Sequence, residues 1–220
     1  MKSFESILKA AVEKHGQAEL DRRLPKPKSA RSLTATADDR YLSAMAKCIF
    51  QAGFVWKVVE NMWPGFEEVF LGFDPVDLVA LQPEQIDAVK QDPRVIRNSQ
   101  KILSVFDNAR FVSRVAEEHG SFGKFLATWP DDDLSGLWNR LSKEGSRLGG
   151  MTGPRFLRNV GKDTFILSPD VIKALTGAGV IDKPPTGKKA LAACHAAFDR
   201  WRDESGLSYS ALSVVAACSV

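Results

Sequence analysis

Apolar residues recur every three or four positions along most of the chain, which is the spacing of one face of an α-helix. Residues 3–24 show this spacing first. A second run extends from Tyr41 to Trp63, where the residues WPGF end it. Each run predicts one amphipathic helix.

The segment PKPKSARSLTATADD, which begins at Pro25, interrupts this pattern. Its prolines disfavour helix, and Asp38 or Asp39 is suited to be the N-cap of the next helix. We therefore expect residues 1–37 to form an N-terminal helix and linker, and residues 38–220 to form the main domain.

The helical period continues to the C-terminus in shorter segments. Three of them combine proline with a nearby acidic residue, as helix starts often do: GFDPVDLVAL, QPEQIDAVKQD and PRVIRNSQKILSVFDNARFVSRVAEEHG. DTFIL has the character of a strand but is too short and isolated to make a sheet. The chain is predicted to be all-α, with about ten short helices. The later predicted helices are SFGKFLATW, DDDLSGLWNRLSKEG, PRFLRNVGK, SPDVIKALTGAG, GKKALAACHAAFDRWRDESG and a short one at the C-terminus.

Composition narrows the range of functions. The 220 residues, 44% hydrophobic and 26% charged, suit one large or two small globular domains. The net charge is only +3, so binding to a polyanion would need a local basic patch. Three cysteines and three histidines lack zinc-site spacing, so we expect no metal and no cofactor. The chain has neither a membrane-spanning apolar run nor a signal peptide, and we expect a reduced, cytoplasmic monomer.

Residues 146–157, SRLGGMTGPRFL, place three glycines and a proline between two predicted helices. Glycines without side chains, at a helix N-terminus that carries partial positive charge, let a phosphate come close. The pattern Leu148-x-Gly150-Met151-x-Gly153-Pro154 resembles the signature of helix-hairpin-helix DNA-binding motifs, with Thr152 as one extra residue. A glycine-rich helix end followed by proline is the alternative. The residues expected to bind DNA here are Arg147, Gly149, Gly150, Thr152, Gly153 and Arg155.

Arg97 and Lys101 are expected to contribute to the same interface. They are four residues apart in a predicted helix with no acid between them, so they repel unless a phosphate neutralises them. A solvated, charged helix face is the alternative for this pair.

Three segments, FQAGFVWKVV, FEEVFLGFDPVDLVAL and VIRNSQKILSVFDNAR, follow one another in the order and spacing of a known family. They resemble the Q-A-G-x-x-W, F-x-x-F-D-P and I-I-R…K-I…N-A-R motifs of the DNA-3-methyladenine glycosylase I family, over roughly residues 41–111. The resemblance implies a helix-hairpin-helix DNA glycosylase-like helical bundle. It also implies a base-excision repair enzyme that hydrolyses the N-glycosidic bond of alkylated purines, such as 3-methyladenine, in duplex DNA.

The resemblance also implies roles for single residues. Trp56 matches the tryptophan that stacks on the flipped base, and Phe50 and Gln51 lie in the segment that forms the pocket wall. Cys48 stands where the family has a glutamate, and the family's zinc site has no counterpart, so the chain resembles a divergent subgroup of the family. Core packing is the alternative for Trp56.

The segment ILSPD resembles the aspartate segment that follows the hairpin in the alkylation-repair branch of these glycosylases, which makes Asp170 the catalytic candidate. The alternative is a first-turn acid behind an N-cap at Ser168. No lysine stands just before this segment, Lys162 being the nearest, so the enzyme is expected to be monofunctional. A catalytically inactive DNA-binding module of the same fold, or a helical protein–protein scaffold, are the other functions left open.

Overall fold

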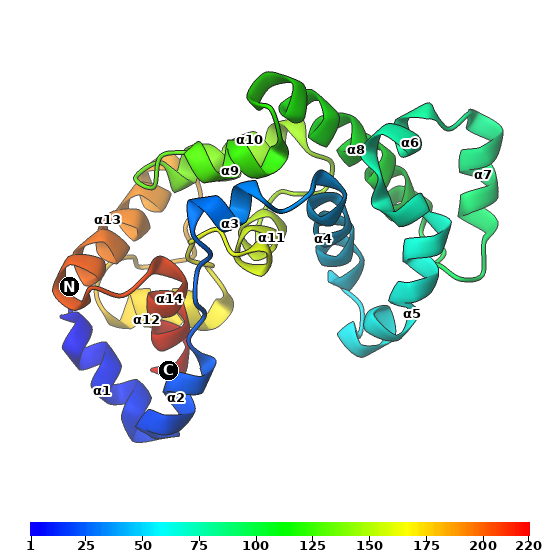
Figure 1. Ribbon diagram of the computed structural model, residues 1–220. Helices are drawn as coiled ribbons and strands as arrows, with labels where there is room; N and C mark the ends of the chain where they lie inside the picture. The colour runs from blue at the N-terminus through cyan, green and yellow to red at the C-terminus, as the bar shows by residue number, and fades with distance from the viewer. The chain divides into compact units, whose positions relative to one another are not determined.

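The computed structural model describes residues 1–220 and contains fourteen α-helices, one 3₁₀ turn and no strand. The predicted all-α class is confirmed (Figure 1). No helix is both long and apolar enough to cross a bilayer. The elements are α1 (Phe4–His15), α2 (Gln17–Arg23), α3 (Ala30–Thr34), α4 (Asp38–Gln51), α5 (Trp56–Val69), η1 (Leu71–Phe73), α6 (Pro75–Ala80), α7 (Pro83–Gln91), α8 (Ser99–His119), α9 (Phe122–Thr128), α10 (Leu134–Glu144), α11 (Thr152–Val160), α12 (Pro169–Gly177), α13 (Lys188–Ser205) and α14 (Tyr209–Cys218).

The chain divides into two compact units, one formed by Met1–Pro27 with Asp163–Val220 and the other by Lys28–Lys162. This division differs from the expected boundary between residues 1–37 and 38–220. The first helix is tied to α13, because the backbone N–H of Phe4 donates to Glu204 at 2.6 Å. The end of the expected linker instead joins the second unit as α3, which packs on α9.

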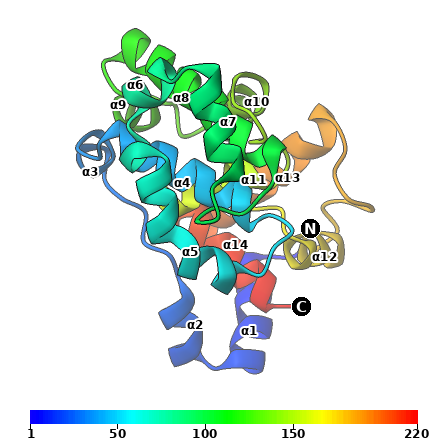
Figure 2. The same cartoon turned by 90° about the vertical axis from the view of Figure 1, so that its right-hand side faces the viewer.

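The first unit contains α1, α2 and α12 to α14. One helix was expected over residues 3–24, but the helix breaks at Gly16, whose φ of 77° is unfavourable for residues with a side chain. Figure 2 shows α1 and α2 side by side as a result. In the core of this unit, the rings of Phe165 and Phe198 stack with their centroids 4.3 Å apart.

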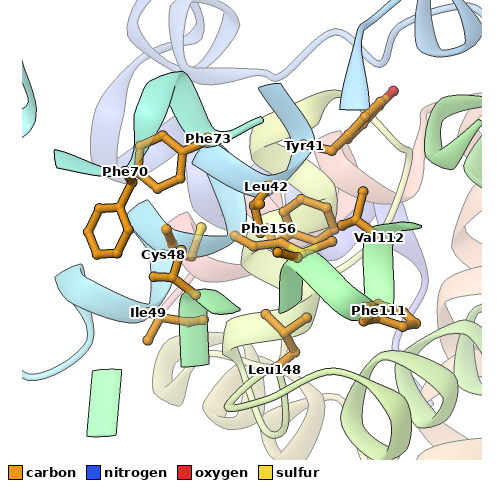
Figure 3. Packing of buried hydrophobic residues seen from close by; sticks show 14 of the residues in the cluster. Tyr41, Leu42, Cys48, Ile49, Phe70, Phe73, Phe111, Val112, Leu148 and Phe156 are labelled. Atoms are coloured by element: carbon orange, nitrogen blue, oxygen red, sulfur yellow. The ribbon is translucent and has the colours of Figure 1, made fainter. Parts of the chain in front are cut away.

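The core of the second unit surrounds α4, which packs against α8 and α11. Figure 3 shows side chains of α4, such as Leu42, meeting Val112 of α8 and Phe156 of α11. Aromatic rings fill the neighbouring part of the core. The Trp63 ring stacks on Phe73 at 5.4 Å, and it also stacks on Phe66.

The predicted helix from Tyr41 to Trp63 is two helices, because residues 52–55 leave the helical conformation between Gln51 and Trp56. Gly53 in this break has a φ of 75°. The expected stop at WPGF is also wrong. Pro64 lies inside α5, which continues to Val69 because the burial of Val59 and Phe66 holds it in place.

Asn108, in the middle of α8, ties this helix to the segment between α10 and α11. Its side chain is fully buried. The Oδ1 atom accepts a hydrogen bond from the backbone N–H of Ser146 at 2.8 Å, and Nδ2 donates to the carbonyl of the same residue at 3.0 Å. This two-bond clamp fixes the chain at the start of the glycine-rich turn.

Replacing Asn108 by aspartate keeps the shape but removes the donor, so the Ser146 carbonyl loses its partner and a charge is buried. We expect the free energy of unfolding to fall by about 1–3 kcal/mol. Denaturant unfolding measures this loss. Asp107→Asn on the adjacent, exposed position is the control and should change stability by less than about 0.5 kcal/mol. Equal stability of the two variants would show that the clamp contributes nothing.

Candidate nucleic-acid interface

The segment from Gly145 to Met151 is a tight turn between α10 and α11. Gly150 has a φ of 59°, and Arg147 has a φ of 61°, a left-handed conformation that is uncommon for a residue with a side chain. Gly153, in the first turn of α11, is required for a different reason. A Cβ atom there would lie 2.6 Å from the Leu148 carbonyl oxygen, closer than any side chain could come.

The N-terminus of α11 faces this turn without a capping side chain. Met151 is the N-cap, it makes no side-chain cap hydrogen bond, and the first turn has no acidic residue. Backbone N–H groups at a helix start attract anions, and the helix dipole strengthens this attraction. The sequence predicted two helices joined by a tight glycine-rich turn, and this local arrangement is present. Phosphate binding at the turn stays a prediction.

A cleft of about 420 Å³ lies between the end of α4, the start of α8 and the glycine-rich turn. It brings together four of the residues predicted to bind DNA, and none of the residues that line it is acidic. Its walls thus combine positive charge with backbone of the turn. The lining residues are Ile49, Ala52, Lys101, Arg147, Gly149 and Thr152.

Lys101 has a different position from the one expected. It is buried, and its Nζ donates to the carbonyl oxygens of Ala52 at 2.6 Å and Phe50 at 3.2 Å. Burial, and then the charge of Arg147, lower the pKa of Lys101. Its ammonium therefore satisfies the last carbonyls of α4, the partners that a helix C-terminus lacks.

Arg97 does not share a helix face with Lys101. The Asn98 side chain accepts a hydrogen bond from the backbone N–H of Lys101 and so starts α8 at Ser99. Arg97 precedes the helix and is exposed. The sequence placed Arg97 and Lys101 on one helix, where their charges would repel. Because α8 begins only at Ser99, Arg97 lies outside the helix and this repulsion is absent.

Trp56 is the first residue of α5 and is 49% exposed, so it is not a core residue. The guanidinium carbon of Arg155, on α11, lies 5.2 Å from the centroid of its ring. Such a cation over an indole face is attracted by the negative charge of the ring face. Trp56 was predicted to stack on the base and Arg155 to bind the DNA backbone. The fold brings these two side chains into contact.

Phe50 and Gln51, the other residues expected to contact a base, are buried at the end of α4. The Phe50 ring packs edge-on against Phe66 with the centroids 4.7 Å apart. This residue belongs to the core, because the side of α4 that carries it faces α5 rather than the turn.

Cys48 is also buried, 6% exposed, and its Sγ accepts a hydrogen bond from Nδ2 of Asn159 at 3.3 Å. Burial raises the pKa of the Cys48 thiol to about 11. The thiol is therefore neutral at physiological pH and cannot replace the charge of a carboxylate. Asn159 was not predicted, and no sequence signal distinguished it from other polar residues of α11.

Asp170 belongs to the first unit, in the first turn of α12. It is exposed, and its Oδ1 lies 3.3 Å from Nζ of Lys173. The Ser168 side chain caps the helix by accepting a hydrogen bond from the Val171 N–H. The alternative interpretation of Asp170 was a first-turn acid that follows an N-cap at Ser168. This local structure is present. No group of three His, Cys, Asp or Glu side chains could hold a metal ion.

A family model described as Methyladenine glycosylase matches residues 33–143, which is 111 of the 220 residues and includes the cleft walls from α4 and α8. The chain belongs to the methyladenine glycosylase family. The resemblance seen in the three sequence segments is confirmed.

The chain is also similar in sequence to a known glycosylase. DNA-3-methyladenine glycosylase 1 of Escherichia coli is 32% identical over 76 residues, which cover 34% of this chain and 41% of that protein. The chain therefore matches less than half of that relative's length.

Two solved structures share the fold. 3-Methyladenine DNA glycosylase I of Staphylococcus aureus superposes with a TM-score of 0.51 and 20% identity over 69% of this chain and 91% of its own. The 8-oxoguanine glycosylase/lyase of Methanocaldococcus jannaschii, solved with DNA, has a TM-score of 0.58 and 13% identity over 97% and 94%. The expected DNA-glycosylase fold is confirmed by both.

The state of Cys48 can be tested by alkylation. At pH 8 we expect iodoacetamide to modify it at least about 100-fold more slowly than an unhindered cysteine, because its thiolate fraction is lower by about that factor. Mass spectrometry of the Cys48 peptide measures the rate, which should still be rising at pH 10. The same peptide in denaturant is the control. A rate that levels off below pH 9 would contradict a raised pKa.

Proposed function

We propose that this protein is a monofunctional DNA glycosylase that removes alkylated purines, such as 3-methyladenine, from duplex DNA by hydrolysing the N-glycosidic bond. The observation that carries the proposal is the exposed Trp56, in contact with Arg155 of α11, in a chain of the methyladenine glycosylase family. In this reading the protein acts as a monomer in base-excision repair.

The turn supplies the contact to the DNA backbone. Gly149 and Gly150 precede α11 and Gly153 lies in its first turn, so these positions carry no side chain to hinder a phosphate, and Arg147 adds charge at the edge of the turn. Such contacts hold the duplex regardless of sequence, because phosphates carry no base information. Thr152, which lines the cleft, offers a hydroxyl to the same phosphate.

Trp56 supplies the surface for the base. A damaged nucleotide must leave the helix before its bond can be cut, and an aromatic face holds it once it is out. The reaction then breaks the C1′–N bond, whose electron pair stays with the base. An N3-methylated adenine is cationic in the nucleoside and therefore leaves as the neutral base. Water bonds to C1′ of the sugar cation and gives up a proton to solvent, so the positive charge ends on that proton.

Positive charge develops on the sugar during this step, and a carboxylate nearby stabilises it. We assign this role to Asp170. The support is its sequence position after the hairpin, at the start of α12, and its exposed carboxylate.

The second candidate is a DNA-binding module without catalysis, and the neutral Cys48 favours it. Incubating the protein with methylated duplex DNA and detecting free bases by chromatography separates the two. Release of 3-methyladenine supports the glycosylase. Release by Cys48→Glu but not by the natural protein identifies a binding module that lost one acid.

Replacing Trp56 by alanine should lower base release at least about tenfold, since stacking of a base on an aromatic ring contributes about 1–3 kcal/mol. Affinity for undamaged duplex should stay within a few-fold, because the turn is intact. Single-turnover release and fluorescence anisotropy measure the two. Trp63→Phe, inside the aromatic core, is the matched control for losing an indole. Unchanged release by the Trp56 variant would remove this residue from the site.

Replacing Asp170 by asparagine should abolish most base release and leave DNA affinity unchanged, if its charge stabilises the sugar. The variant should lose less than about 1 kcal/mol of stability, because only a first-turn charge is removed while Ser168 still caps α12. Release kinetics and thermal unfolding are the measurements. Lys173→Gln, which breaks the same ion pair from the other side, is the control. Equal release by the natural protein and the Asp170 variant would exclude this aspartate from the mechanism.

A further inference from the structure

Asn159 is a polar residue of α11 that has no part in the reaction described so far. It lies four residues after Arg155, so the two side chains are neighbours on one face of the helix. The guanidinium carbon of Arg155 lies 5.2 Å from the centroid of the Trp56 ring. Asn159 is exposed, and it therefore presents a carboxamide one helical turn away from that contact.

Cys48 of α4 lies beneath this face of α11. Its Sγ is buried and accepts a hydrogen bond from Nδ2 of Asn159 at 3.3 Å. Burial raises the pKa of the Cys48 thiol, while the hydrogen bond from Asn159 and the positive charge of Arg155 each lower it. Both residues of α11 thus act on Cys48, and α4 and α11 pack against each other. The carboxamide and the guanidinium that covers the indole therefore belong to one surface.

The bond to Cys48 also orients the carboxamide. One branch of this planar group donates hydrogen bonds and the other accepts them. The sulfur atom acts as the acceptor, so the Nδ2 branch is turned inward. The Oδ1 branch remains able to accept a hydrogen bond from a ligand on the exposed side.

The Arg155 guanidinium shows that the Trp56 ring can hold a flat cation. An N3-methylated adenine is also a flat cation in the nucleoside, and it can displace the guanidinium from the ring. Adenine carries an amino donor at C6, whereas guanine carries a carbonyl acceptor there. An amide oxygen beside the ring attracts the first and repels the second. The positive charge of the methylated adenine strengthens the hydrogen bond from its amino group.

We infer that Asn159 recognises the C6 amino group of a methylated adenine stacked on Trp56, and that Cys48 is a positioning residue that holds the amide with its oxygen outward. The inference rests on the proposed glycosylase function and deepens it by assigning the choice of adenine over 6-oxopurines to one side chain.

Binding of free bases tests this recognition without requiring catalysis. 3-Methyladenine and 3-methylhypoxanthine differ at C6, where the first has an amino group and the second has a carbonyl oxygen. Isothermal titration calorimetry measures the affinity of the natural protein for each base. We expect 3-methyladenine to bind about tenfold more tightly, which is within the discrimination that amide side chains achieve between bases.

Asn159→Leu keeps the approximate size of the side chain and removes the acceptor, so the ratio of the two affinities should fall close to one. Asn159→Asp keeps an acceptor oxygen and should retain most of the ratio. Asn139→Leu is the matched control, because Asn139 is an exposed asparagine of α10, a helix that does not line the cleft. Circular dichroism confirms that each variant is folded.

The same ratio tests Cys48. Cys48→Ala removes the acceptor that orients the amide, so the ratio should fall about threefold or more. Cys48→Ser supplies another acceptor and should retain most of the ratio. If Cys48→Ala weakens the binding of both bases equally, Cys48 has only a structural role and its assignment as a positioning residue is wrong.

Three results would overturn the role of Asn159: equal or tighter binding of 3-methylhypoxanthine, no binding of either base, or the same ratio in Asn159→Leu and Asn139→Leu. Methylated duplexes are measured in parallel. Release of no base from these duplexes would refute the glycosylase function, while the ratio of the free-base affinities would still decide the role of Asn159.

Discussion

The ammonium of Lys101 on the last carbonyls of α4 is the interaction on which the site depends. A helix that ends in the interior leaves carbonyl groups that need partners. Lys101 supplies them for Phe50 and Ala52, and the chain leaves the helical path there. Because of that break, Trp56 begins a new helix instead of continuing the buried stripe of the old one, and its ring becomes exposed. A buried charge in α8 thus stabilises the end of α4, and Gly53 with its positive φ lets the chain turn before the exposed Trp56.

The same logic explains which parts of the fold could be predicted. Helical spacing in the sequence reflects which side chains are buried, and the all-α class follows from it. Apolar spacing does not show where a helix is interrupted when the apolar residues before and after the break continue the same three-to-four-residue spacing. The runs at residues 3–24 and Tyr41 to Trp63 therefore each concealed a break, at Gly16 and at residues 52–55. Pro64 shows the reverse error, since tertiary packing overrode a local stop signal.

Prediction of the site was limited because the sequence pattern does not show which distant chain segments pack against a residue. The glycines of the turn could be identified because backbone freedom is visible in residue type, and Gly153 meets a backbone oxygen that excludes any side chain. Whether a lysine is exposed to phosphate or buried against carbonyls depends on distant chain segments, so Lys101 looked like a surface residue. Phe50 and Trp56 are both aromatic and six residues apart, yet one is in the core and the other outside.

The skeleton of the site and its charge are carried by different residues. Asn108, Gly153 and Lys101 are buried and hold backbone, so changing them disturbs the turn or the end of α4. Arg147 is exposed and Arg155 is partly exposed, and neither supports the core. Substitution of Arg155 can therefore change the charge over the Trp56 ring, and substitution of Arg147 the charge of the cleft, while the scaffold stays in place. Since exchanges at exposed positions cost little stability, the charge of the site can be altered without disturbing the buried residues that hold its backbone.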